Sequence, residues 1–86
     1  MMAKSRLTQL GYVYNSLPRY KVLVKGINKM DYTKYKLVGK YIFDEKKRKV
    51  GQVLDVVGNV NEPYILVKSL EEIKKGEKVF FEERRR

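Results

Sequence analysis

Residues 50–68 read Val-Gly-Gln-Val-Leu-Asp-Val-Val-Gly-Asn-Val-Asn-Glu-Pro-Tyr-Ile-Leu-Val-Lys, and they carry the clearest structural pattern in the chain. Two runs rich in β-branched residues flank a turn region at 58–63, a pattern typical of two strands joined as a hairpin. Gly58 permits a backbone angle that valine would not adopt, and Pro63, which lacks an amide donor, belongs at the start or edge of a strand. Because this stretch is the most apolar part of a heavily charged chain, we expect it to supply the middle of the core.

Segments with a similar pattern lie on both sides of this hairpin. Together with the hairpin they predict six strands, at residues 7–15, 20–25, 37–44, 50–57, 64–68 and 77–82. In the first of these strands the period of two places Leu10, Tyr12 and Tyr14 on one face. Gly39 breaks the alternation of the third predicted strand and indicates a β-bulge there.

The predicted connections carry turn-forming residues. We expect a turn at 15–18, where Pro18 follows residues that favour local hydrogen bonds, and a charged hairpin tip at 44–49. Residues 69–76 are expected to form a single helical turn, since Ser69 has the character of an N-cap and Gly76 that of a helix stop.

Six short strands with a turn signal about every ten residues indicate an all-β fold. Closing the sheet would remove its exposed edges, which are a hazard for a small β protein. We therefore predict a small six-stranded antiparallel β-barrel that forms a single domain over residues 7–82. A flexible basic N-terminus at 1–6 and a charged tail at 83–86 would flank it.

Composition excludes several function classes. The chain has 86 residues and no cysteine, so neither a disulfide nor a thiolate metal site supplements the core. It also has no histidine, and the usual neutral-pH proton shuttle is therefore missing. Asp55 is the one carboxylate within an apolar strand, and we interpret it as an outward-facing side chain. We predict no catalytic residue, no cofactor and no metal.

No apolar run approaches the roughly 20 residues that a membrane-spanning helix needs, and the N-terminus does not resemble a signal peptide. We expect a soluble, intracellular chain without a membrane partner.

The net charge is +10, and it is concentrated toward the N-terminus, where residues 1–36 contain eight Lys or Arg against one acid. A field of this sign favours association with polyanions such as RNA. It does not require direct contact, because a basic subunit inside a ribonucleoprotein gains from the same long-range attraction. Five residues are candidates for RNA contact or for steering: Tyr32, Tyr35, Lys46, Lys47 and Arg48. The alternative to RNA contact is that the two tyrosines cover one end of the barrel. For Lys46, Lys47 and Arg48 the alternative is a solvated turn.

Apolar side chains crowd around the turn at 58–63. They are Val57, Val60, Pro63, Tyr64 and Ile65. A strand pair buries only alternate side chains, so some of these should project outward as an apolar patch of the kind that marks a partner surface. Tyr64 would be a suitable anchor, being large and amphipathic. A lid over the core is the alternative interpretation.

The stretch from 49 to 68 also carries a resemblance. Its Val50-Gly51-x-Val53-x-Asp55-Val56-Val57-Gly58-x-Val60 run, followed by Pro63-Tyr64, resembles the archaeal form of the Gar family. That family comprises the small basic subunits of H/ACA ribonucleoproteins, which convert uridine to pseudouridine under the direction of a guide RNA. The resemblance covers about residues 6–83. Asn59 stands where the family usually has proline, and the Arg/Gly-rich tails of eukaryotic members are absent.

The resemblance implies a barrel similar to the second domain of translation elongation factors. It implies binding to the pseudouridine synthase subunit, which would hold the catalytic aspartate, and help in positioning a mobile synthase loop that governs substrate loading and product release. Guide RNA and the other complex proteins would be reached indirectly, with little or no contact to RNA. The expected location is cytoplasmic, or nucleolar in a eukaryote. The residues expected at or beside the synthase are Val57, Gly58, Asn59, Val60, Pro63, Tyr64 and Ile65.

A second function stays open at this point. The chain could be a directly RNA-binding β-barrel of ribosomal or translation-factor type, acting through its tyrosines and basic hairpin tip. Binding through several phosphates should weaken steeply with salt, whereas binding through an apolar interface should change little. An exposed apolar patch also leaves open a weak self-association when no partner is present.

Overall fold

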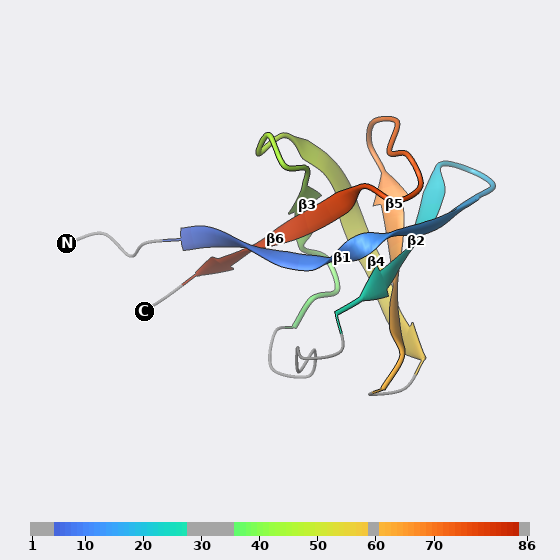
Figure 1. The fold of residues 1–86 in the computed structure, drawn as a ribbon, viewed down its shortest axis with the longest axis horizontal. Coiled ribbons are helices and arrows are strands. Elements are labelled where there is room, and N and C mark those ends of the chain that lie inside the picture. The colour runs from blue at the N-terminus through green and yellow to red at the C-terminus, as the bar shows by residue number, and fades with distance from the viewer. Residues whose placement is uncertain (1–4, 28–35, 59–60, 85–86) are drawn as a thin grey trace.

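The computed structural model describes residues 5–27, 36–58 and 61–84 (Figure 1). Its strands are β1 (Ser5–Leu17), β2 (Lys21–Gly26), β3 (Tyr41–Phe43), β4 (Lys49–Gly58), β5 (Pro63–Ser69) and β6 (Lys78–Arg84). They close into a barrel in the order β1-β2-β5-β4-β3-β6, and every neighbouring pair is antiparallel. The predicted all-β, six-stranded antiparallel barrel is thus confirmed.

Alternating side chains of the strands fill the barrel. The largest wholly buried side chains are Phe81, Leu10, Ile42 and Ile65, with valines from β1, β2, β4, β5 and β6 between them. In β2 and β5 every second residue is buried, the pattern of strands with one face in the core. Residues 50–68 supply four core residues: Val50, Val53, Ile65 and Val67.

Strand β1 has two irregularities that the sequence pattern does not reveal. Its pairing with β6 shifts between Gln9 and Gly11, and its pairing with β2 shifts between Val13 and Asn15. Leu10 is the extra residue in the first shift, and it lies in the core, whereas Tyr12 and Tyr14 lie on the outside of the barrel. The prediction that Leu10 shares a face with the two tyrosines is therefore wrong, because a bulge reverses the alternation beyond it.

Two predicted boundaries also differ. Strand β1 continues to Leu17 and its turn lies at residues 18–20, not at 15–18. Residues 37–40 form a turn, and Gly39 belongs to this turn and not to a bulge within a strand. The turn is paired to β4 at Val53, which donates its amide to the Lys40 carbonyl at 2.8 Å and accepts a hydrogen bond from the Gly39 amide at 2.8 Å. Only Tyr41–Phe43 remains as β3.

The connection from β5 to β6 contains no helical turn, contrary to the prediction for residues 69–76. Ser69 ends β5, and its amide and hydroxyl both donate to the Tyr20 carbonyl, at 2.7 and 3.1 Å. The Leu70 amide donates to the Val50 carbonyl at 2.8 Å. These hydrogen bonds tie the start of the connection to the β1–β2 turn and to β4, and Ile73 further along is buried against the core.

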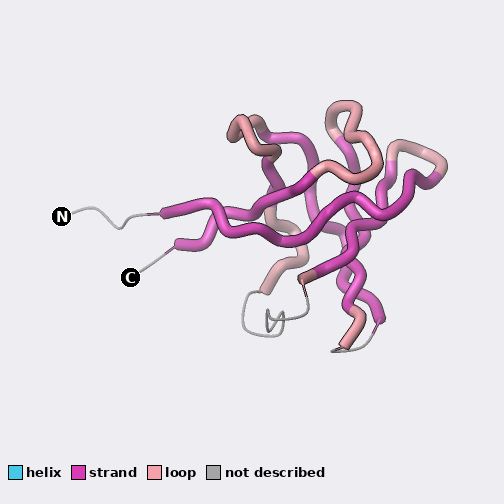
Figure 2. Tube along the Cα trace, in the orientation of Figure 1, coloured by secondary structure: helices cyan, strands magenta, loops and turns pink. Residues whose placement is uncertain are grey.

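The described loops gather at the two ends of the barrel (Figure 2). At one end lie the turns at 18–20 and 44–48 and the connection at 70–77. At the other end lie the turn at 37–40 and the end of the β4–β5 hairpin. Within the described ranges, no helix has the length and apolar character that crossing a membrane requires.

Candidate functional site

The end of the β4–β5 hairpin is closed by two residue pairs. Val57 lies opposite Tyr64, and Gly58 lies opposite Pro63. Gly58 has a φ of +88°, and a Cβ atom added to it would lie 2.6 Å from the Glu62 carbonyl oxygen. Both its backbone angle and the space beside it therefore require glycine, as predicted. We call Val57, Gly58, Pro63 and Tyr64 the hairpin corner.

Strand alternation divides the residues predicted to face a partner. Val57 is 41% exposed and Tyr64 is half-buried, whereas Pro63 is buried and Ile65 is fully buried in the core. Ile65 therefore cannot offer contact area, and its place among the partner-facing residues is corrected. Its neighbour Tyr64 faces outward, so Ile65 must face inward. Asn59 and Val60 lie outside the described residues.

Tyr64 is braced by a second aromatic side chain. The ring of Tyr14 on β1 meets the ring of Tyr64 on β5 edge to face, with centroids 5.5 Å apart and an interplanar angle of 66°. This is a favoured geometry for an aromatic pair. Sequence reasoning missed the contact, because the bulge that turns Tyr14 outward has no clear signal in the chain. Val57 and Tyr64 of the hairpin corner, together with Tyr14, make a partly exposed apolar surface.

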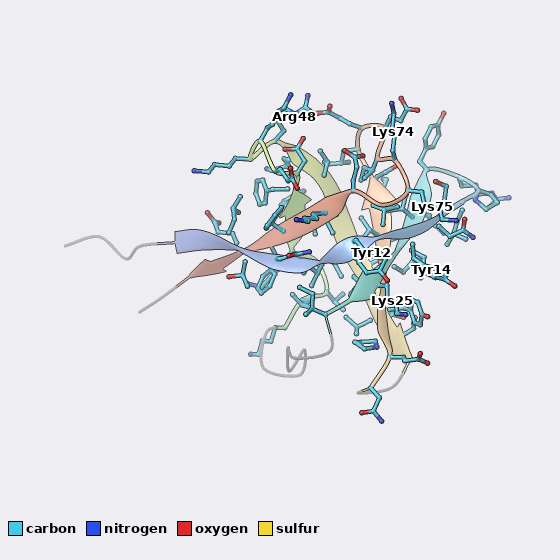
Figure 3. All side chains as sticks on the ribbon, viewed as in Figure 1. Tyr12, Tyr14, Lys25, Arg48, Lys74 and Lys75 are labelled. Atoms are coloured by element: carbon cyan, nitrogen blue, oxygen red, sulfur yellow. The ribbon has the colours of Figure 1, made fainter. Side chains whose placement is uncertain are left out.

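Asp44 organises the basic hairpin tip at the opposite end of the barrel. Its carboxylate accepts hydrogen bonds from the Lys46 amide at 2.8 Å and from the Arg48 amide at 2.9 Å. It also accepts one from Arg48 Nε at 2.8 Å (Arg48 is labelled in Figure 3). The hydrogen bond from the Arg48 amide is the largest cause that lowers the pKa of Asp44, and the guanidinium and the Lys46 amide add to it against the opposing effect of burial.

The candidate RNA-contacting residues at this tip are therefore not equivalent. All three side chains are exposed, but Arg48 is held at its Nε by Asp44, which raises the pKa of its guanidinium. A shallow cleft between the tip and the start of β6 also contains Glu45 and Glu77, so the charge there is mixed. Tyr32 and Tyr35 lie outside the described residues.

Replacing Asp44 by asparagine tests the role of this turn. The folded-state pKa lies below the ordinary value of 3.8. The ionised carboxylate therefore stabilises the fold above that pH, and its contribution is lost as the pH falls through the folded pKa. We expect Asp44→Asn to lower Tm at neutral pH and to reduce the fall of Tm on acidification from about pH 7 to about pH 2. Circular dichroism melting curves measure both effects.

Asp55→Asn is the matched control, because it makes the same change in net charge at an exposed position of β4. Equal losses of Tm in the two variants at neutral pH would mean that net charge, and not the hydrogen bonds of the turn, causes the effect.

Asp55 itself faces outward, as interpreted from the sequence. It is exposed, and its carboxylate accepts a hydrogen bond from the amide of Val56 at 2.8 Å. A bulge between Val53 and Asp55 sets this orientation.

A closed β-barrel with a net charge of +10 and a partly exposed apolar corner is a small basic binding module. Residues 7–85 match the family described as the Gar1/Naf1 RNA binding region, and the chain belongs to this family. The resemblance noted in the sequence is thereby confirmed. Comparison with curated proteins gave no match. Family membership gives the chain an RNA-associated role of H/ACA type. It implies association with RNA and with ribonucleoprotein proteins. The family is one of non-catalytic subunits.

Proposed function

We propose that the chain is the non-catalytic subunit of an H/ACA guide-RNA ribonucleoprotein that binds the pseudouridine synthase and assists substrate loading and product release in rRNA pseudouridylation. Family membership supports the type of complex. The observation that carries the proposed contact is the hairpin corner, where Val57 and Tyr64 remain partly exposed on an apolar surface. Guide RNA and the other complex proteins would be reached through the synthase.

The hairpin corner has the properties of a binding surface that is formed before the partner arrives. Gly58 closes it with a backbone conformation that other residues do not adopt readily, and the Tyr14 ring restrains Tyr64. A restrained aromatic loses little side-chain entropy when it binds, so more of its contact energy appears as affinity. Tyrosine is also one of the residues that most often dominate an interface.

Such a subunit acts on the enzyme by stabilising one conformation of the enzyme. It can shift the position of a mobile synthase loop only if it binds one loop position more tightly than another. A difference of about 1.4 kcal/mol between the binding free energies for the two loop positions would change the ratio of their populations tenfold. In many enzymes loop opening and product release limit turnover. A rigid barrel that favours one loop position would therefore affect substrate loading and product release without a catalytic group of its own.

The alternative function, direct RNA binding through the basic hairpin tip, has weaker support. The Arg48 guanidinium is engaged by Asp44, and acidic side chains line the neighbouring cleft. The alternative would use Lys46, Lys47 and the exposed part of the Arg48 side chain, together with Tyr32 and Tyr35.

Capture of the pseudouridine synthase without RNA tests the proposal. The tagged full chain, treated with nuclease, is mixed with purified synthase in moderate salt. We expect capture that weakens only slightly as salt is raised, because an apolar contact releases few counterions. Failure to capture the synthase, or capture that requires added RNA, would contradict the proposed contact.

A further inference from the structure

The outside of the barrel carries a row of tyrosines and lysines that the proposed synthase contact does not explain. Strand register places Tyr12 on β1 between Lys78 on β6 and Lys25 on β2, and Lys25 lies opposite Tyr64 on β5. Figure 3 shows Tyr12, Tyr14 and Lys25 on the same side of the barrel. We call these five residues the tyrosine–lysine face: Tyr12, Tyr14, Lys25, Tyr64 and Lys78.

The aromatic rings of this face are available to a ligand. Tyr12 and Tyr14 are 40% and 44% exposed. Tyr14 and Tyr64 already form an edge-to-face pair, and Tyr12 stands apart from Tyr64 with β2 between their strands. Neighbouring strands are about 4.8 Å apart, so the backbones at Tyr12 and Tyr64 are about 10 Å apart, with Lys25 in register between them. The face therefore offers Tyr12 and the Tyr14–Tyr64 pair as its aromatic positions.

The charged residues in register with Tyr12 and Tyr64 are the lysines Lys78 and Lys25. Strands β2 and β5 contain no acidic residue, and their opposed pair Lys21 and Lys68 lies at the end where Lys21 lines a pocket with Glu71 and Glu72. The end of the barrel with the basic hairpin tip differs, because acids accompany its cations: Asp44, Glu45, Glu71, Glu72 and Glu77. A polyanion is therefore attracted more consistently to the side of the barrel than to that end.

We propose that the tyrosine–lysine face binds single-stranded RNA, with bases stacked on Tyr12 and on the Tyr14–Tyr64 pair and phosphates beside Lys25 and Lys78. Exposed aromatics on a sheet, with cations between them, are the means by which β-sheet and β-barrel proteins bind unpaired strands. A duplex hides the faces of its bases, so this surface selects unpaired RNA. Stacking is tolerant of sequence, so the face binds without reading particular bases.

This site goes beyond the proposed synthase contact, and it differs from the expectation of little or no RNA contact that the resemblance implied. The family description names RNA binding. We assign this binding to the tyrosine–lysine face, through base stacking on the tyrosines and phosphate contacts with the lysines. Tyr64 belongs both to this face and to the hairpin corner. Tyr14 braces Tyr64, whereas Tyr12 lies on β1 outside the corner, so Tyr12→Ala tests the RNA site independently of the synthase contact.

Fluorescence anisotropy with the full chain provides the test. The probes are a labelled oligouridine of about ten nucleotides, within the site size of such barrels, and an RNA duplex of the same length. We expect tighter binding to the oligouridine. Tyr12→Ala should weaken it about tenfold and Tyr12→Ala with Tyr14→Ala about a hundredfold, whereas Tyr12→Phe, which keeps the stacking ring, should stay within about twofold of the unmodified chain.

The salt dependence tests the lysines. Lys25→Gln should reduce the slope of log affinity against log salt by about 0.7, the value for one phosphate contact to a single strand. Lys47→Gln, which removes an exposed cation at the hairpin tip, is the matched control and should leave the slope unchanged. Tyr20→Ala, at an 81% exposed tyrosine in the β1–β2 turn, is the control for the aromatic variants. Urea unfolding of each variant verifies that it is folded.

Three results would overturn the proposal. The first is an unchanged affinity for oligouridine in the folded double variant that carries Tyr12→Ala and Tyr14→Ala. The second is an equal loss of slope in Lys25→Gln and Lys47→Gln, which would mean that charge acts without a defined site. The third is tyrosine variants that keep RNA binding and lose the synthase, which would assign this face to the protein interface.

Discussion

Replacing Gly11 by alanine should destabilise the barrel by about 3 kcal/mol or more, a loss large enough to threaten folding of a domain this small. Gly11 lies in β1 opposite Gly26 in β2. A Cβ atom on Gly11 would lie 2.0 Å from the Lys25 carbonyl oxygen and 3.1 Å from the Gly26 Cα atom. These are backbone atoms of the neighbouring strand, so the strands themselves would have to separate.

Urea unfolding followed by circular dichroism measures this loss. Gly76→Ala is the control, because it adds the same methyl group where no atom lies within 4 Å, although at a φ of +91°. The left-handed backbone alone should make the control cost about 1 kcal/mol. If the two variants lost equal stability, the close approach of β1 and β2 at Gly11 would not be a constraint on the fold.

Replacing Val57 by aspartate should weaken synthase binding by about 2 kcal/mol or more, which is roughly thirtyfold in Kd. A carboxylate placed in an apolar contact loses its hydration without gaining a partner. Tyr64→Ala should have an effect of similar size, because it removes the proposed aromatic anchor. Isothermal titration calorimetry with purified synthase and no RNA measures both.

Leu70→Asp is the matched control for Val57→Asp. Leu70 is a 48% exposed aliphatic residue in the β5–β6 connection, at the other end of the barrel from the hairpin corner. It should leave the affinity unchanged. If Leu70→Asp weakened binding and Val57→Asp did not, the synthase would contact the opposite end of the barrel.

The strands that the sequence predicts best are those with strong alternation and clear turns. In 50–57 and 64–68 the β-branched residues alternate around a glycine that the turn requires, and both strands form with their core residues buried. The long β1 was harder to predict. Its Leu-Gly-Tyr-Val-Tyr sequence fits either face, and the bulges depend on pairing with β2 and β6, which lie far away in sequence.

Strand alternation also decides which residues of the candidate site could be predicted from the sequence. Val57 and Tyr64 do face outward, because they alternate with the neighbouring pair Val56 and Ile65, which packs in the core. Ile65 does not, because grouping apolar residues by their nearness to a loop ignores the alternation of the strand. In the sequence Asp44 is only one member of a charged run. Its role depends on a turn that directs the Lys46 and Arg48 amides at its carboxylate, and composition does not reveal such a geometry.

The pairing of β1 with β6 has a consequence for the order in which the protein folds during synthesis. Strand β1 leaves the ribosome first and can form its hairpin with β2 at once, but its other edge pairs with the last strand, as at Thr8 and Phe81. Until β6 emerges, that edge and the edge of β3 stay open, and open edges invite pairing with other chains. The barrel can therefore close only when β6 has left the ribosome, and a nascent chain stalled before that point exposes both open edges.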